Sequence, residues 1–201
     1  MKKSLLLLPV ALIAMAMALT ACGGGSSSSG GGDEAAIEEA IETSATSSDP
    51  SKCTEVQTEA FNEAESGKTG EAALEACEEE AGNESEPAES VSVSNISEDG
   101  DTATAEVAIT GGSLEGQSVE VGLTNEEGDW KLNEFAGFTK YDPAGIASLV
   151  EEQLSEEGGA AGAIATCVAE GIEEMSEEEA EAMVFEKDNK GVEEIATACS
   201  E

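Results

Sequence analysis

The spacing of apolar residues changes twice along this chain, and this change constrains the fold more than any other feature of the sequence. Between residues 33 and 82, apolar side chains recur three or four positions apart, as they do on one face of a helix. From Val91 to Phe138 they alternate with polar residues, which is the pattern of strands with one buried face. From Asp142 onward the helical spacing returns. The sequence therefore predicts an α+β protein.

Three helices are expected before the strands. Their apolar stripes are Ala36, Ile37, Ala40 and Ile41; then Cys53, Val56, Ala60, Phe61 and Ala64; then Ala73, Leu74, Cys77 and Ala81. Four strands should follow, because turn-forming residues occupy 98–101, 111–116 and 125–129. Neighbouring strands joined by tight turns form an antiparallel meander, and its apolar face needs the three helices as a cover.

The last segment, 142–201, is expected to be a small all-α module of four helices. Asp142-Pro143 should open the first helix, and Ser176 with Glu179 has the spacing of a capping box that would open the third.

The chain is strongly acidic, with 45 Asp and Glu, 8 Lys and Arg, and a formal net charge of -37. Nucleic acid is excluded as a direct partner, because phosphate contacts need clustered basic side chains. Adsorption to anionic headgroups is disfavoured as well, so a membrane link must be covalent. This composition fits a protein from salty surroundings, where counterions screen self-repulsion, and fits an ordinary acidic secreted protein equally well.

The N-terminal segment combines a positive start, an apolar stretch and a terminal cysteine. Lys2 and Lys3 precede an apolar run from Leu5 to Leu19, and the segment ends Leu19-Thr20-Ala21-Cys22. An aliphatic residue, two small residues and a cysteine form a lipobox, so the segment resembles the leader of bacterial lipoproteins. The resemblance implies cleavage before Cys22 and a lipid on its thiol, which would anchor the protein to the outer side of the cell membrane. An uncleaved transmembrane helix is the alternative, for which the run is short.

These features divide the chain into four expected parts: a signal peptide over 1–21, lipidated Cys22 with a Gly/Ser tether over 22–32, an α+β domain over 33–141 and the helical module over 142–201. The tether has almost no side-chain surface to bury and is expected to act as a flexible spacer.

Four cysteines remain after Cys22, and an even number outside the cytoplasm favours disulfides. Of the three pairings, Cys53–Cys77 and Cys167–Cys199 are expected, because each pair joins the apolar stripes of two nearby helices within one module. Metal ligation or a redox pair is the alternative. The chain has no His and no CxxC motif, so neither a metal site nor a cofactor is predicted.

Other patterns with chemical potential have simpler interpretations. Gly67-Lys68-Thr69 lacks the earlier glycine of a phosphate-binding loop and is interpreted as a loop between helices. Asp99 and Asp101 around Gly100 are too few for a calcium loop and fit a hairpin turn. The acidic runs 78–80, 126–127 and 177–179 are interpreted as solvated faces rather than paired catalytic carboxylates.

Helices followed by a four-stranded meander resemble the cone-shaped fold of the nuclear-transport-factor-two-like superfamily, in particular its small domains in bacterial lipoproteins. The resemblance covers about 33–141 and rests on element order and turn placement. It implies a curved sheet around a ligand pocket, and Trp130, Phe135, Phe138 and Tyr141 are candidates to line that pocket. In the alternative interpretation they form the core and the contact between the two modules.

The expected role is that of a non-enzymatic binding protein of the cell envelope, whose partner is a small apolar ligand or another envelope protein. Enzymes of the cone-shaped superfamily use a His, Asp or Tyr inside the cavity, whereas this chain has no His and its only Tyr falls at the domain junction. A carboxylate-dependent enzyme and a passive acidic envelope component are the alternatives.

Overall fold

The computed structural model describes residues 33–82 and 87–200. The expected signal peptide, the lipobox with Cys22, and the tether lie outside the described residues. The secondary-structure elements in chain order are α1 (Asp33–Thr46), α2 (Lys52–Glu55), α3 (Glu59–Ser66), α4 (Glu71–Gly82), β1 (Ser90–Asp99), β2 (Thr102–Thr110), the 3₁₀ helix η1 (Gly112–Leu114), β3 (Ser118–Glu126), β4 (Asp129–Lys140), α5 (Pro143–Glu157), α6 (Gly159–Glu173), α7 (Glu177–Val184) and α8 (Lys190–Cys199).

The four strands form one antiparallel sheet in the order β1-β2-β3-β4, so the expected meander is confirmed. The β1–β2 hairpin turns at Gly100, whose φ of 68° suits glycine and fits the hairpin interpretation of this acidic turn. Along β2, Ala103, Ala105 and Val107 are buried while Thr102 and Thr104 are exposed, as the alternation predicts. One face of the sheet is therefore apolar.

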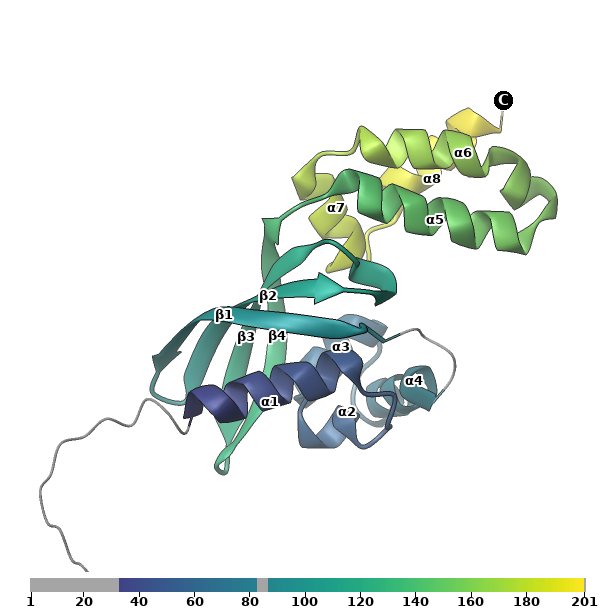
Figure 1. Ribbon diagram of the computed structural model, residues 1–201. Coiled ribbons are helices and arrows are strands. Elements are labelled where there is room, and N and C mark those ends of the chain that lie inside the picture. The colour runs from purple at the N-terminus through teal and green to yellow at the C-terminus, as the bar shows by residue number, and fades with distance from the viewer. Residues whose placement is uncertain (1–32, 83–86, 201) are drawn as a thin grey trace, which may run out of the picture.

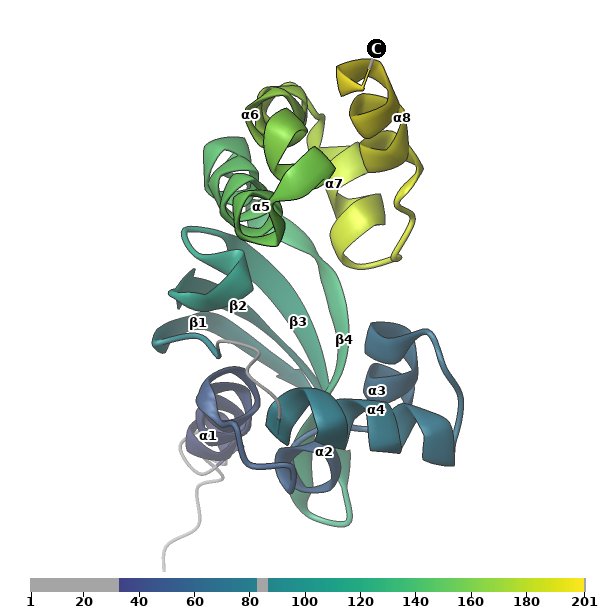
Figure 2. The ribbon, with the colours of Figure 1, turned by 90° about the vertical axis from the view of Figure 1, so that its right-hand side faces the viewer.

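Helices cover the sheet from both ends of the chain. Figure 1 shows α1 to α4 below the strands and α5 to α8 above them, and Figure 2 shows the same arrangement from a perpendicular direction. α1 packs on β1 and β4, and α3 packs on β4, whereas α4 packs mainly on α2 and α3. The expectation that all three N-terminal helices lie on the sheet is therefore wrong in detail.

Four helices, and not three, precede the sheet within the described residues, because the second expected helix is interrupted. The backbone N–H of Thr58 donates to Leu132 O at 2.9 Å, and Leu132 N–H donates to Val56 O at 2.9 Å. Gln57 thereby forms a parallel bridge with β4. The Thr58 side chain then accepts a hydrogen bond from Phe61 N and caps α3. Hydrogen bonds to the edge strand β4 thus interrupt the second expected helix between Val56 and Thr58.

The C-terminal segment consists of four helices, as expected, and its buried side chains continue the core of the sheet. Ile146, Val168 and Ile172 belong to the same buried cluster as the inward side chains of β2 and β3. Ser176 and Glu179 form the predicted capping box at the start of α7. The two ends of the Gln117 side chain bond the backbone of Asp142, which fixes the start of α5 against β3.

Both expected cysteine pairs are disulfides. Cys53–Cys77 joins α2 to α4 with a Cα–Cα distance of 6.0 Å, and Cys167–Cys199 joins α6 to α8 with a distance of 5.8 Å. These distances lie within the usual range for disulfides. Within 33–82 and 87–200, no helix is both long and apolar enough to cross a membrane.

Candidate functional site

A cavity of about 450 Å³ lies between the apolar face of the sheet and the helices around it. α1, α3 and α4 form one side, β2 and β4 form the floor, and α5 and α7 reach it from the C-terminal segment. Typical small-molecule sites have volumes of about 300–1,000 Å³. The cavity therefore has the size of a ligand site.

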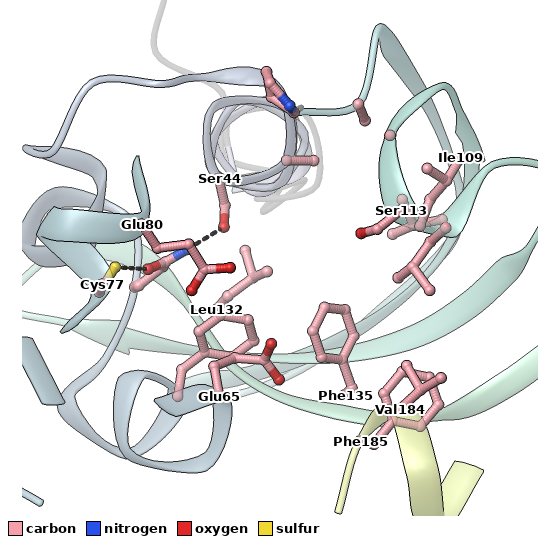
Figure 3. A pocket seen from close by; sticks show the side chains of 18 of the residues that line it. Ser44, Glu65, Cys77, Glu80, Ile109, Ser113, Leu132, Phe135, Val184 and Phe185 are labelled. Carbon is pink, nitrogen blue, oxygen red and sulfur yellow. Dashed lines mark hydrogen bonds between the residues drawn. The ribbon is translucent and has the colours of Figure 1, made fainter. Parts of the chain in front are cut away.

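Three phenylalanines form an aromatic wall. The ring of Phe135 lies 5.3 Å from the ring of Phe61 and 5.3 Å from that of Phe185, measured between centroids. Phe61 comes from α3, Phe135 from β4, and Phe185 directly follows α7. In Figure 3, Phe135, Val184 and Phe185 lie together at one end of the cavity, away from Ser44 and Cys77. Leu132, Ile109 and Ile146 add aliphatic surface.

The opposite end is polar and holds two buried amide side chains. Gln57 Nε2 donates to Ser44 Oγ at 2.7 Å, and Asn62 Nδ2 donates to the backbone O of Cys53 at 2.8 Å. Gln57 Oε1 lies 3.2 Å from Cys77 Sγ. That sulfur is half of a disulfide and has no proton to donate, so we interpret the dashed line between them in Figure 3 as a sulfur–oxygen contact.

Four charged side chains line the same space: Lys52, Glu65, Glu80 and Lys187. Lys187 Nζ forms an ion pair with Glu65 Oε2 at 3.3 Å, and this pair joins α3 to the segment after α7. Lys52 Nζ donates to Ser44 O at 3.1 Å. Figure 3 shows the carboxylates of Glu65 and Glu80 directed into the space between them.

Burial changes the acidity of two of these groups. Desolvation raises the pKa of Glu65, the ion pair with Lys187 opposes that rise, and the charge of Glu80 adds to it. Desolvation also lowers the pKa of Lys52, against the favourable charge of Glu80. Titratable groups with such shifts inside a cavity are typical of functional sites.

Of the four aromatic residues that the sequence singled out, Phe135 lines this cavity. Trp130 and Phe138 are buried in the core, with 5% and 8% of their surface exposed. Tyr141 lies at the junction before α5, where its hydroxyl donates to Met175 O at 3.4 Å. Burial, together with nearby Glu177 and Glu179, raises the pKa of Tyr141. These three residues therefore have the core and junction positions of the alternative interpretation.

The polar residues of the cavity were not found from the sequence. Ser44, Lys52, Gln57, Asn62 and Glu65 come from three helices and a bridge, and no motif links them. The one local signal is the spacing of Phe61, Asn62 and Glu65, which places them on one side of α3.

Of the possible phosphate loop, the possible calcium loop and the acidic runs, Glu80 alone lines this cavity. Gly67 ends α3 with φ 64°, as the loop interpretation of 67–69 requires. The acidic runs at 78–80, 126–127 and 177–179 are exposed. Among the residues described, no cluster of three or more His, Cys, Asp or Glu is arranged to hold a metal ion.

Comparison of the chain with protein-family models, with curated proteins and with solved structures gives no match.

Proposed function

We propose that this protein is a lipid-anchored binding protein of the bacterial cell envelope, and that it holds a small, largely apolar molecule in the cavity between sheet and helices. The observation that carries the proposal is the cavity itself. It combines a volume of about 450 Å³ and a wall of Phe61, Phe135 and Phe185 with a small set of polar groups at one end. Mostly apolar lining with a few convergent polar groups is the usual composition of ligand sites.

The arrangement of elements supports the proposed relation to the nuclear-transport-factor-two-like cone fold. Helices precede a four-stranded meander, and the cavity lies on the apolar face of that sheet. Bulges interrupt the β3–β4 pairing at three places, and bulges bend the strands that contain them. A bent sheet with a cavity on its apolar side is the geometry that the proposed fold requires.

The proposed anchor is a lipid on Cys22, and it can be tested separately from ligand binding. Cells fed a labelled fatty acid should transfer the label to the wild-type protein, which should stay with the membrane fraction. The Cys22→Ser variant should carry no label, even if its uncleaved apolar leader keeps it in the membrane. Equal labelling of both proteins would refute lipidation of Cys22.

Ligand binding can be tested by filling the cavity. Ala45 on α1 lines it, and an Ala45→Phe substitution would place a ring inside. Ala35→Phe makes the same change on the exposed side of the same helix and serves as the control. A neutral fluorescent dye such as N-phenyl-1-naphthylamine should bind the wild type and the control and should bind Ala45→Phe at least about tenfold more weakly. Equal binding by all three proteins would exclude this cavity as the site.

Acid–base catalysis at Glu65 is the second candidate function, because burial raises the pKa of this carboxyl inside a cavity. The ion pair with Lys187 favours its charged form instead and suits a binding role better. A reaction that the wild type catalyses and Glu65→Gln does not, with dye binding unchanged, would assign the enzymatic role.

A further inference from the structure

The polar end of the cavity contains a buried acceptor without a donor. Asn62 is 4% exposed and lines the cavity, and its Oδ1 receives no hydrogen bond from any described residue. The orientation of this amide is fixed, because its Nδ2 must be the atom that faces the carbonyl of Cys53 at 2.8 Å. An acceptor left without a partner inside a protein costs free energy, so a ligand that donates to it would be favoured.

A second acceptor lies close to the first along the chain. Gln57 is 7% exposed, and its Nε2 is already bonded to Ser44. Its Oε1 contacts a disulfide sulfur that has no hydrogen. Each amide group of the cavity thus uses one N–H within the protein, while its oxygen accepts no hydrogen from a described residue.

The third acceptor is the carboxylate of Glu65. It follows Asn62 by three positions on α3, so the two side chains project from the same side of the helix. Lys187 occupies part of this carboxylate, but a carboxylate has about four acceptor sites and can take further donors. Glu80, the neighbouring carboxylate, adds negative charge to the same end.

We propose that the molecule held in this cavity is an amphipathic primary amine, whose apolar body lies against the phenylalanine wall and whose ammonium group donates to Asn62 Oδ1, Gln57 Oε1 and the Glu65 carboxylate. This inference rests on the binding function proposed above. An ammonium group has three N–H donors and no acceptor, which matches the three acceptors. Its charge also matches the carboxylates, and hydrogen bonds to charged groups are the stronger kind.

An anionic ligand fits less well. One N–H of Gln57 and one N–H of Asn62 are bonded within the protein. Each lysine of the cavity has a backbone carbonyl as partner, Ser44 O for Lys52 and Val184 O for Lys187. The chain as a whole carries a formal charge of -37 and repels anions on approach.

The test compares three probes that share one alkyl chain and differ in the head group: decylamine, decanol and decanoate. Each displaces N-phenyl-1-naphthylamine from the folded protein at neutral pH, below the concentration at which the probe forms micelles. High salt screens attraction of the amine to the acidic surface. Decylamine should displace the dye at a concentration about tenfold or more below that of decanol, and decanoate should be the weakest.

Two variants show whether the preference arises at the proposed site. Glu65→Gln should reduce the preference for decylamine over decanol by about tenfold. Decanol has no charge, so unchanged displacement of the dye by decanol shows that the cavity of the variant is still folded. Glu59→Gln removes the same charge from the exposed side of α3, outside the cavity, and should leave the preference unchanged. Lys187→Met breaks the ion pair but keeps the carboxylate, so the preference should persist or increase.

The outcomes separate this inference from the proposed function. Displacement by all three probes at similar concentrations, or best by decanoate, would refute the amine and leave a cavity that binds apolar molecules. An unchanged preference in Glu65→Gln would refute the site of the head group. If neither the dye nor any probe binds, the proposed binding function fails as well.

Discussion

Opening the Cys53–Cys77 disulfide should destabilise the protein by an amount that the chain length predicts. The bridge joins α2 to α4 across a sequence separation of 24, and closing a loop of that length restricts the unfolded chain. The chain-entropy relation gives about 3.5 kcal/mol for it at 25 °C. Since a small domain has a total stability of about 5–15 kcal/mol, this loss should be large.

The measurement isolates one bridge without changing core volume. A Cys167→Ala/Cys199→Ala variant keeps only the Cys53–Cys77 bridge, and its urea unfolding is compared before and after chemical reduction. Cys53 is 1% exposed and stays in place as a thiol, so reduction leaves no cavity. Trp130 is the single tryptophan and lies in the core, so its fluorescence reports unfolding of the sheet. The reduced protein should lose about 3.5 kcal/mol.

The other bridge provides the matched comparison. Cys167–Cys199 spans a separation of 32, for which the same relation gives about 3.7 kcal/mol. Reduction of a Cys53→Ala/Cys77→Ala variant should therefore cost nearly the same. A loss below about 1 kcal/mol for either bridge, or losses that differ by more than about 2 kcal/mol, would refute an account based on loop closure.

Three further outcomes follow from particular contacts. Gly171→Ala should lower the free energy of unfolding by about 1 kcal/mol, because the new Cβ would lie 2.5 Å from Ile195 Cγ2 and the overpacking outweighs the gain in helix propensity. In Gly162→Ala, on the same helix, the new Cβ meets nothing closer than 3.5 Å, so this variant should be more stable than the wild type. A loss of stability in Gly162→Ala would contradict the reasoning. Ser176→Ala should cost about 1 kcal/mol in urea unfolding by removing the capping box, and no measurable change would refute that role. Since burial raises the pKa of Glu65, the folded state binds a proton at this carboxyl more tightly than the unfolded state. The stability of the wild type relative to Glu65→Gln should therefore fall as the pH rises from the ordinary glutamate pKa through the raised one. An increase in relative stability over that pH range would refute the prediction.

Local patterns in the sequence were sufficient for the order of elements. The alternation in 91–138 predicted four strands because side chains of a strand point to opposite faces, and each hairpin requires its own turn residues. The capping box of Ser176 was predictable because both partners lie within one helical turn. The cysteine pairs could be inferred because each joins two helices close in sequence.

Only the tertiary structure decided where the second expected helix breaks. The pattern from Cys53 to Ala64 has helical spacing throughout, yet Val56 and Thr58 bond to Leu132, which lies on β4 far along the chain. A hydrogen bond to a distant strand leaves no local signal, so it was not predictable from spacing. The fourth N-terminal helix follows from that bond.

The sequence by itself determined the element types, the disulfide partners and the strongly acidic character of this protein, because those depend on short-range periodicity, cysteine spacing and composition. The tertiary structure alone decided the cavity and selected Glu65 from 45 acidic residues as one that burial perturbs. Desolvation depends on which helices and strands close around a side chain, and those segments come from distant parts of the chain.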